Sequence, residues 1–462
     1  MKTDFSSLPL STELLTVLKE LGYENQTPIQ AASIPVLLEG KDLIGQSKTG
    51  SGKTAAYALP LLQNLYLEDK SLQILILCPT RELATQVVTE IRKLGRRLEG
   101  LQVLPLVGGV AGREQAQSLD RGVQIAVGTP GRVLDLISRG RMYLANIKTV
   151  VLDEADKMLD MGFEQELTAL MAELPVQRQT ALFSATFPDS IAALSKRYQK
   201  NPERIAIEDT SAEATTIEQF VYDAYPDDKP NMLMRILQQH PSNSTIIFCN
   251  MKATVKELAE RFAEQNVGSG ALHGDLEQRE RDQVMALFRN GSYRILIATD
   301  VAARGLDIKG LELVVNFDMP AQAETHVHRI GRTGRAGKAG VAVTIADPRD
   351  SLKVLELEKI TNQKMVRQNL GFKNQHGLNK EMREAAMQTL TISGGRKDKL
   401  RPGDILGALT RDVGIDGSEI GKIEIQDKIS YVGISAKASQ KAFEGLRNAK
   451  IKGQKFQIKL MK

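Results

Sequence analysis

The sequence predicts an α/β protein with two parallel-sheet domains in tandem and a small α+β domain at the C-terminus. Short apolar runs alternate with longer amphipathic stretches through residues 1–205 and again through 225–350, a texture typical of parallel sheets covered by helices on both faces. Residues 387–462 instead follow the order βαββαβ, which is typical of a split βαβ unit. A chain of 462 residues has room for two to four such domains.

The strands are predicted from apolar, mostly β-branched or leucine-rich runs. In the two large domains these runs are Gln73–Cys78, Val123–Val127, Thr149–Leu152, Thr180–Phe183, Thr245–Phe248, Arg294–Ala298 and Leu313–Asn316. In the C-terminal part, alternation predicts strands at 387–393, 420–425, 429–434 and 455–460, and helices at 402–409 and 436–449.

Two polar segments without apolar periodicity predict linkers, at residues 208–217 and 371–386. The domains are therefore expected at 1–207, 218–370 and 387–462. Two α/β domains on a short tether could open and close over a ligand held between them.

Composition excludes several classes of protein. A hydrophobic fraction of 42% and a charged fraction of 25% exclude a disordered chain, and two cysteines exclude a disulfide scaffold. No apolar run approaches the roughly 20 residues that span a bilayer, and Met1–Leu15 lacks the apolar core of a signal peptide. We expect a cytoplasmic protein. Cys78 and Cys249 are expected to be buried thiols, since with five scattered histidines they form no zinc pattern.

The net charge of +5 is unevenly distributed. Residues 387–462 hold 15 Lys and Arg against 8 Asp and Glu, whereas the rest of the chain is slightly acidic. This asymmetry indicates either a module that binds a polyanion or an ordinary solvated basic surface.

A glycine-rich loop predicts a phosphate site. Ser47, Lys48, Thr49, Gly50, Ser51, Gly52, Lys53 and Thr54 come after a predicted strand at 42–45 and precede a predicted helix that starts near Ala55. Backbone N–H groups of such a loop face phosphate oxygens, Lys53 can reach the β and γ phosphates, and the Thr54 hydroxyl can bind Mg²⁺. The alternative is a glycine-rich turn with a lysine there by chance.

A second acidic element completes this interpretation. Asp153 and Glu154 come directly after the apolar run Thr149–Leu152, so they are expected at the carboxyl edge of the sheet, where α/β proteins bind ligands. Asp153 can hold Mg²⁺ through water, and Glu154 can orient or deprotonate the attacking water. The alternative is a solvated strand end.

The segment Asp153–Asp156 spells Asp-Glu-Ala-Asp, and from Phe5 to Asp347 the chain resembles the DEAD-box RNA helicases. The family motifs occur in order at 22–30, 47–54, 79–84, 108–109, 129–132, 153–156, 184–186, 246–250, 278 with 281, 298–307 and 328–335. Ser47 stands where the family usually has alanine. The resemblance implies two RecA-like domains, and ATP and Mg²⁺ as cofactors.

Several residue types fit the implied ATP chemistry. The Gln30 amide both donates and accepts, so it can read the adenine edge, which favours ATP over GTP. Phe5 could stack on the base or could be an ordinary apolar anchor. Arg332 and Arg335 lie three residues apart and could act as arginine fingers supplied by the second domain, so that hydrolysis requires domain closure. Asp307 would accept from the ribose.

The RNA contacts come mainly from the resemblance. It implies that one bent RNA strand lies across both domains, on Pro79, Thr80, Arg81, Gly108, Gly109, Thr129, Arg132, Gln278, Arg281 and Thr299. Hydroxyls and backbone N–H groups of this kind contact phosphates without reading sequence. Ser184, Thr186 and His328 are implied to couple the state of the nucleotide to RNA. A bent strand cannot remain in a duplex, so we expect local strand separation.

From near Gly371 to its end, the chain resembles the C-terminal domain of a bacterial DEAD-box protein of large-subunit assembly. The resemblance implies a diverged RNA-recognition fold that binds a hairpin in the peptidyl-transferase region of 23S ribosomal RNA. Its predicted sheet offers only Tyr431 for base stacking, so the sheet face is not expected to be a stacking platform. We instead expect RNA contacts from basic residues, among them Arg396, Lys397, Lys450 and Lys452.

The sequence therefore predicts an RNA-dependent ATPase and helicase that acts on precursors of the large ribosomal subunit. Two other functions stay open. One is an ATP-gated RNA clamp that binds without useful unwinding, and the other is a DNA helicase or an unrelated P-loop ATPase, against which Gln30 and the motif set argue. No heptad pattern is present, so we expect a monomer.

Overall fold

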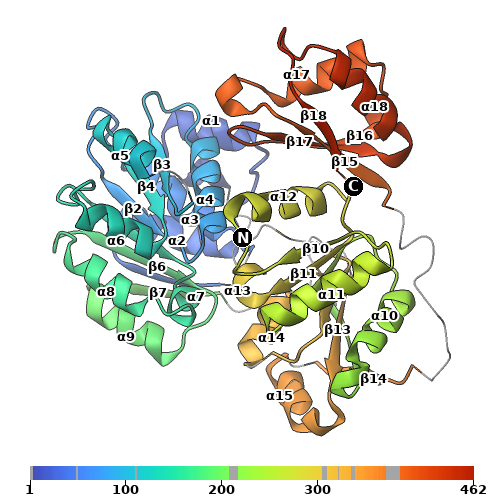
Figure 1. Ribbon diagram of the computed structural model, residues 1–462. Coiled ribbons are helices and arrows are strands. Elements are labelled where there is room, and N and C mark those ends of the chain that lie inside the picture. Colours follow the sequence, from blue (N-terminus) through green and yellow to red (C-terminus); the bar gives the residue numbers. More distant parts are fainter. Residues whose placement is uncertain are drawn as a thin grey trace. The chain divides into compact units, whose positions relative to one another are not determined.

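The computed structural model describes residues 4–461 except 48–49, 110–111, 208–216, 304–307, 309, 321, 335–338, 362 and 371–384. Most of the two expected linkers thus lies outside the described residues. The chain divides into two compact units, of which the structure describes 4–207 in the first and 217–461 in the second, with the gaps just given. The predicted fold class is confirmed, because the structure has two seven-stranded parallel sheets and one four-stranded antiparallel sheet (Figure 1).

The first unit is built on a parallel sheet in the order β3-β4-β2-β5-β6-β1-β7. Its strands are β1 (Leu43–Gln46), β2 (Ile74–Leu77), β3 (Val103–Leu106), β4 (Ile125–Gly128), β5 (Thr149–Asp153), β6 (Gln179–Ser184) and β7 (Glu203–Ala206). Its helices are α1 (Thr12–Glu20), α2 (Pro28–Leu38), α3 (Lys53–Gln63), α4 (Arg81–Leu94), α5 (Gly112–Asp120), α6 (Pro130–Ser138), α7 (Ala155–Asp160), α8 (Glu164–Ala172) and α9 (Asp189–Tyr198).

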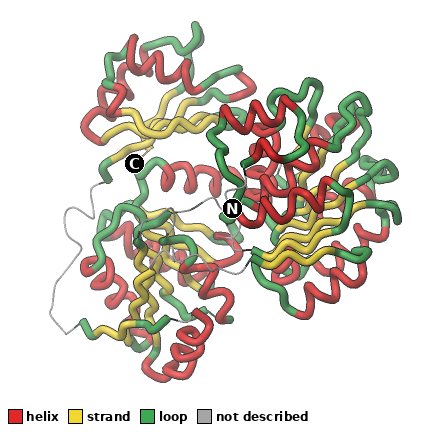
Figure 2. The backbone as a smooth tube through the Cα atoms, turned by 180° about the vertical axis from the view of Figure 1, so that it is seen from behind, coloured by secondary structure: helices red, strands yellow, loops and turns green. Residues whose placement is uncertain are grey.

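Helices cover both faces of this sheet, which explains why its central strands are mostly apolar (Figure 2). Helix α4 shows how the sequence determines one such element. The Thr80 hydroxyl accepts a hydrogen bond from the backbone N–H of Leu83 at 3.2 Å and so caps the helix. Residues Val87, Val88 and Ile91 then recur at helical spacing and are buried against the sheet.

The second unit begins with a parallel sheet in the order β10-β11-β9-β12-β13-β8-β14. Its strands are β8 (Ile217–Asp223), β9 (Thr245–Cys249), β10 (Ser269–Leu272), β11 (Ile295–Thr299), β12 (Leu313–Asn316), β13 (Gly340–Ala346) and β14 (Val366–Gln368). Its helices are α10 (Lys229–Gln239), α11 (Lys252–Glu264), α12 (Gln278–Arg289), α13 (Asp300–Ala303), α14 (Ala323–Ile330) and α15 (Ser351–Thr361).

The C-terminal part of this unit is an antiparallel sheet in the order β16-β17-β15-β18. It comprises β15 (Met387–Ile392), α17 (Pro402–Gly407), β16 (Ile420–Ile425), β17 (Ser430–Ser435), α18 (Ala436–Asn448) and β18 (Ile458–Met461). Leu390, Ile392, Val432 and Ile434 face the two helices and form a core of their own. The predicted βαββαβ order is confirmed. No helix in the described ranges is both long and apolar enough to cross a membrane.

A buried histidine on α14, which contacts residues of the second sheet, predicts an acid-sensitive domain. His326 is fully buried, its Nε2 lies 3.0 Å from the Gln219 amide oxygen, and its Nδ1 accepts from the Asn316 amide at 3.3 Å. Both ring nitrogens are therefore used by the neutral ring. Burial lowers the pKa of His326 to about 4, and Arg329 contributes.

Since an unfolded histidine titrates near 6.5, the unfolded state binds more protons between pH 6.5 and pH 4, and the free energy of unfolding falls as the pH decreases through this window. The loss is about 3 kcal/mol at pH 4. Urea unfolding between pH 7.5 and 4.5 should show a clearly smaller pH slope for His326→Gln than for the parent protein. Equal slopes would contradict this account.

Candidate functional site

The carboxyl edge of the first sheet gathers the expected site residues into two halves. Strands β3, β4 and β2 stand next to one another and run into the expected RNA contacts Gly108, Thr129 and Thr80. Strands β5, β6 and β1 also stand next to one another, and they run into Asp153, Ser184 and the loop 47–54. One edge of one sheet thus presents a nucleotide half and an RNA half.

The loop between β1 and α3 has the geometry of a phosphate cradle. Gly50 and Gly52 have φ angles of 86° and 93°, and a Cβ on Gly52 would lie 2.4 Å from the Gln30 side chain. The buried Lys53 ammonium donates to the Ser47 carbonyl at 2.7 Å. The Ser47 and Ser51 hydroxyls hydrogen-bond at 2.8 Å. Lys48 and Thr49 lie outside the described residues.

Gln30 connects the expected adenine side to this loop. Its amide nitrogen donates to the Gly52 carbonyl at 3.2 Å, and its amide oxygen accepts from the Thr27 backbone at 2.9 Å. Phe5 is buried with 2% of its surface exposed and meets the Tyr23 ring edge-on at 5.9 Å. The structure thus brings Gln30 into contact with the phosphate loop and Phe5 into contact with Tyr23.

Asp153 lies in a buried position at the end of β5. Its carboxyl is almost fully buried, and burial together with the Glu154 charge raises its pKa to about 6, although Lys53 and Tyr57 act in the opposite direction. The Tyr57 hydroxyl donates to Asp153 Oδ2 at 2.8 Å. The carboxylate of Asp153 and the hydroxyl of Thr54, at the start of α3, are hard oxygen ligands that fit Mg²⁺.

Glu154 has a strained backbone and a charged partner. Its φ and ψ of 52° and 51° lie in the left-handed region, which is uncommon for a residue with a Cβ and often marks a functional position. The Lys157 ammonium, itself buried, lies 2.8 Å from Glu154 Oε2. The Glu154 carboxylate is therefore held beside the metal-binding candidates by a buried ion pair.

Asp156 joins the nucleotide half of the site to the expected coupling motif. Its Oδ2 accepts hydrogen bonds from the backbone N–H groups of Ala185 and Thr186 at 3.1 and 3.0 Å and from the Thr186 hydroxyl at 3.1 Å. The Ser184 carbonyl accepts from the Ser47 backbone N–H at 3.1 Å. A change in the phosphate loop can thus reach residues 184–186 directly.

In the RNA half of the first unit, the expected arginines contact neighbouring residues of the same half. A Cβ on Gly108 would lie 2.8 Å from an Arg81 nitrogen, so that glycine gives the guanidinium room, and Gly109 has a φ of 79°. Arg132 donates to Gln115 at 2.9 Å and to Asp135 at 2.5 Å. Pro79, which precedes the N-cap residue Thr80 in the sequence, is buried.

The second parallel-sheet domain carries the remaining expected residues. Gln278 donates to Asp282 at 3.0 Å, and Arg281 donates to the Ala302 carbonyl at 3.1 Å, just beyond Thr299 at the end of β11. His328 lies on α14, and Arg332 comes just after that helix with 8% of its surface exposed. Asp307 and Arg335 lie outside the described residues.

In the C-terminal domain, the basic residues that follow β15 and those that follow α18 lie on loops that approach each other. Arg396, Lys397, Lys450 and Lys452 are exposed. The Lys452 ammonium donates to the Lys399 carbonyl at 2.8 Å, and it lies 3.8 Å from Asp404. The loop after α18 is therefore tied to the turn after β15, and one basic surface results.

The face of the C-terminal sheet that carries Tyr431 packs against the parallel-sheet domain. Only 1% of Tyr431 is exposed, and burial raises its pKa to about 12. Beside it, the Thr389 hydroxyl hydrogen-bonds Ser292 at 2.7 Å, and Arg289 pairs with Glu424 at 3.1 Å. The face is covered by the end of α12 and the loop after it, so Tyr431 has no surface on which a base could stack.

Sequence reasoning missed four residues that organise these sites, namely Tyr57, Asp156, Asp300 and Arg329. Asp156 belongs to the Asp-Glu-Ala-Asp motif, but its role depends on three hydrogen bonds to residues far along the chain. Arg329, with 1% exposed, donates to both carboxylate oxygens of Asp300 at 2.7 and 2.6 Å. Arg329 belongs to the motif at 328–335, and its place in that motif was the available signal.

A fold of this kind with these sites defines a class of nucleotide-dependent RNA-remodelling enzymes. Comparison with known proteins shows that the chain belongs to the DEAD-box ATP-dependent RNA helicases. Family models for the DEAD/DEAH box helicase, the helicase conserved C-terminal domain and the DbpA RNA binding domain match residues 27–194, 228–337 and 389–460.

The particular relatives include a protein of the same domain composition. The chain is 45% identical over 461 residues to ATP-dependent RNA helicase DbpA of Escherichia coli, with all of both chains covered. It is 42% identical to DEAD-box ATP-dependent RNA helicase CshA of Geobacillus kaustophilus, over 79% of this chain and 78% of that protein. The structure of Saccharomyces cerevisiae Dbp5 bound to RNA and ADP BeF3 is similar with a TM-score of 0.71 and 33% identity, over 79% of this chain and 96% of that one.

Proposed function

We propose that this RNA helicase acts in the assembly of the large (50S) ribosomal subunit, where it unwinds 23S ribosomal RNA locally and is directed by its C-terminal domain to a hairpin of the peptidyl-transferase region. The observation that carries the proposal is the DbpA-type RNA-binding domain, which accompanies a full-length similarity to E. coli DbpA. We further propose that it works in the cytoplasm as a monomer.

ATP hydrolysis is assigned to residues of both sheets. The loop 47–54 and Gln30 would bind the nucleotide, and Thr54 and Asp153 would hold Mg²⁺, which neutralises charge on the phosphates. Glu154 would orient or deprotonate the attacking water, and Arg332 with Arg335 would stabilise the transition state. The ion pair between Lys157 and Glu154 supports this role, because it holds a buried carboxylate in place next to Asp153.

RNA strand separation is assigned to the hydroxyl, glycine and arginine positions at the two sheet edges. The adjacency of strands β3, β4 and β2 supports one continuous RNA track on the first sheet, and that of β10 and β11 supports another on the second. Contacts with phosphates would hold a strand regardless of its sequence. Sequence selection would then come from the C-terminal domain.

Within that domain we assign RNA binding to the joined basic loops and not to the sheet. Tyr431 and Thr389 are buried against the parallel-sheet domain, whereas Arg396, Lys397 and Lys450 are exposed. Exposed lysines and arginines contribute phosphate contacts. Lys452 is given a second role, because its bond to the Lys399 carbonyl holds the two loops together.

Charge reversal should test this assignment. The triple variant Arg396→Glu, Lys397→Glu and Lys450→Glu is expected to weaken hairpin binding about tenfold or more, since each phosphate contact adds to the salt-dependent affinity. ATPase activity would be measured without RNA, with an unstructured oligomer and with the 23S hairpin fragment, and the Lys53→Ala variant would identify the ATP site.

Lys437→Glu is the matched control, because Lys437 lies at the opposite end of α18, about 20 Å from Lys450. Hairpin affinity that the triple variant leaves unchanged would overturn the basic-loop assignment. Equal stimulation by any RNA would leave the helicase core intact but end the targeting proposal. The alternative of an RNA clamp would be favoured if hydrolysis occurred without multiple turnovers of a short duplex.

A further inference from the structure

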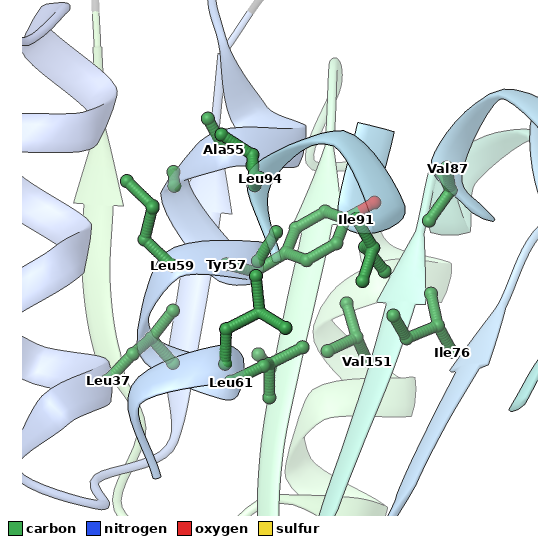
Figure 3. Close-up of a cluster of buried hydrophobic side chains, with 14 of the residues drawn as sticks. Leu37, Ala55, Tyr57, Leu59, Leu61, Ile76, Val87, Ile91, Leu94 and Val151 are labelled. Carbon is green, nitrogen blue, oxygen red and sulfur yellow. The ribbon is translucent and has the colours of Figure 1, made fainter. Parts of the chain in front are cut away.

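One buried hydroxyl hydrogen-bonds a proposed Mg²⁺ ligand and belongs to none of the family motifs. Tyr57 lies on α3, three residues after Thr54, so one helical turn brings the two side chains to the same face. No part of the Tyr57 side chain is exposed. Figure 3 shows its ring between apolar side chains such as Leu59, Ile91 and Val151, with the hydroxyl oxygen at the far end of the ring.

The Tyr57 hydroxyl contacts the carboxylate of Asp153. It donates a hydrogen bond to Asp153 Oδ2 at 2.8 Å. This bond joins the phosphate-loop helix α3 to the end of β5.

The position of the hydroxyl is fixed by its ring. The ring packs against Phe183 with centroids 5.3 Å apart, and Phe183 directly precedes Ser184 at the end of β6. A Cβ at Gly45 in β1 would lie 2.6 Å from the same Phe183 ring, so β1 approaches it closely. The aromatic pair leaves the hydroxyl little freedom to move, since the surrounding core is close-packed.

We infer that Tyr57 is a positioning residue for the metal site: its hydroxyl holds the Asp153 carboxylate in the arrangement that a Mg²⁺-bound nucleotide requires. The inference rests on the proposed use of Asp153 as a metal ligand. Without the hydroxyl, this carboxylate would lose a buried hydrogen-bond donor and would have to be reoriented when the metal binds. The expected consequence is a weaker response of nucleotide affinity to Mg²⁺, not a general loss of nucleotide binding.

The test compares Tyr57→Phe with the parent protein in the full-length chain. The dissociation constant of a fluorescent ADP is measured in EDTA and in excess Mg²⁺, and the ratio of the two constants gives the metal response. Tyr57→Phe is expected to reduce this ratio about tenfold, which is the order of one lost hydrogen bond to a charged group. Affinity in EDTA should stay within about twofold.

The control is Tyr222→Phe, which removes another fully buried phenol that hydrogen-bonds at 2.8 Å, but in the second sheet. An unchanged ratio in Tyr57→Phe would overturn the inference. An equal loss of affinity in EDTA and in Mg²⁺ would also overturn it, because that result would indicate a purely structural tyrosine. If the parent protein itself showed no response to Mg²⁺, the proposed metal ligands would fail instead.

Discussion

Replacing Arg332 by alanine is expected to reduce RNA-stimulated ATP hydrolysis by about a thousandfold or more while the protein still binds ATP. An arginine finger stabilises charge that develops on the phosphates in the transition state, so its loss lowers kcat more than it weakens nucleotide binding. Arg332 is buried just after α14, and its backbone carbonyl accepts from the Leu311 N–H at 3.1 Å. Steady-state ATPase and equilibrium nucleotide binding would be measured side by side.

Two further variants test whether this loss is specific to the guanidinium of Arg332. Arg332→Lys keeps the charge but lacks the planar fork, so most of the loss should remain. Arg349→Ala removes an exposed arginine that pairs with Asp347 in the same domain, and activity should be retained. If Arg332→Ala lost nucleotide binding and hydrolysis in the same proportion, the transition-state role would be wrong.

Replacing Arg329 by methionine is expected to lower the free energy of unfolding of the second unit by about 3–5 kcal/mol, the cost of breaking a buried ion pair on one side. The guanidinium makes a bidentate bond with Asp300, donates to the Asp318 carbonyl at 2.7 Å and donates to Asn250 at 2.9 Å. These bonds connect the ends of β9, β11 and β12 to α14. Urea unfolding of the full-length protein would report the change.

A double-mutant cycle distinguishes this pair from a general packing effect. If Arg329 and Asp300 stabilise each other, the combination of Arg329→Met with Asp300→Ala should cost less than the sum of the two single changes. Additive costs would indicate that Arg329 contributes through its neighbours Asn250 and Asp318, and the ion pair would then be a minor contribution. RNA-stimulated ATPase should also fall, because α14 leads into Arg332.

The strands that could be predicted from sequence are the central ones. Runs such as Thr149–Leu152 and Leu313–Asn316 are buried and mostly apolar because helices cover both faces of the sheet, and this leaves a strong signal in the sequence. The strands β3, β7, β8, β10, β13 and β14 of the two parallel sheets were not predicted. Four of these, β3, β7, β10 and β14, lie at the edges of their sheets, and β3 and β10 contain Pro105 and Gly270, residues that edge strands tolerate but that weaken the pattern. The strands β8 and β13 lie inside the second sheet and were also missed.

The sequence by itself determined the fold class, the phosphate loop and the acidic pair Asp153–Glu154, because each depends on residues that are close together in the chain. Only the tertiary structure decided that the Tyr57 hydroxyl binds Asp153, that Arg329 binds Asp300, and that Tyr431 is covered. These contacts join residues tens of positions apart, or depend on how a domain surface packs. No local spacing encodes them, since the order of strands in a sheet decides which side chains meet.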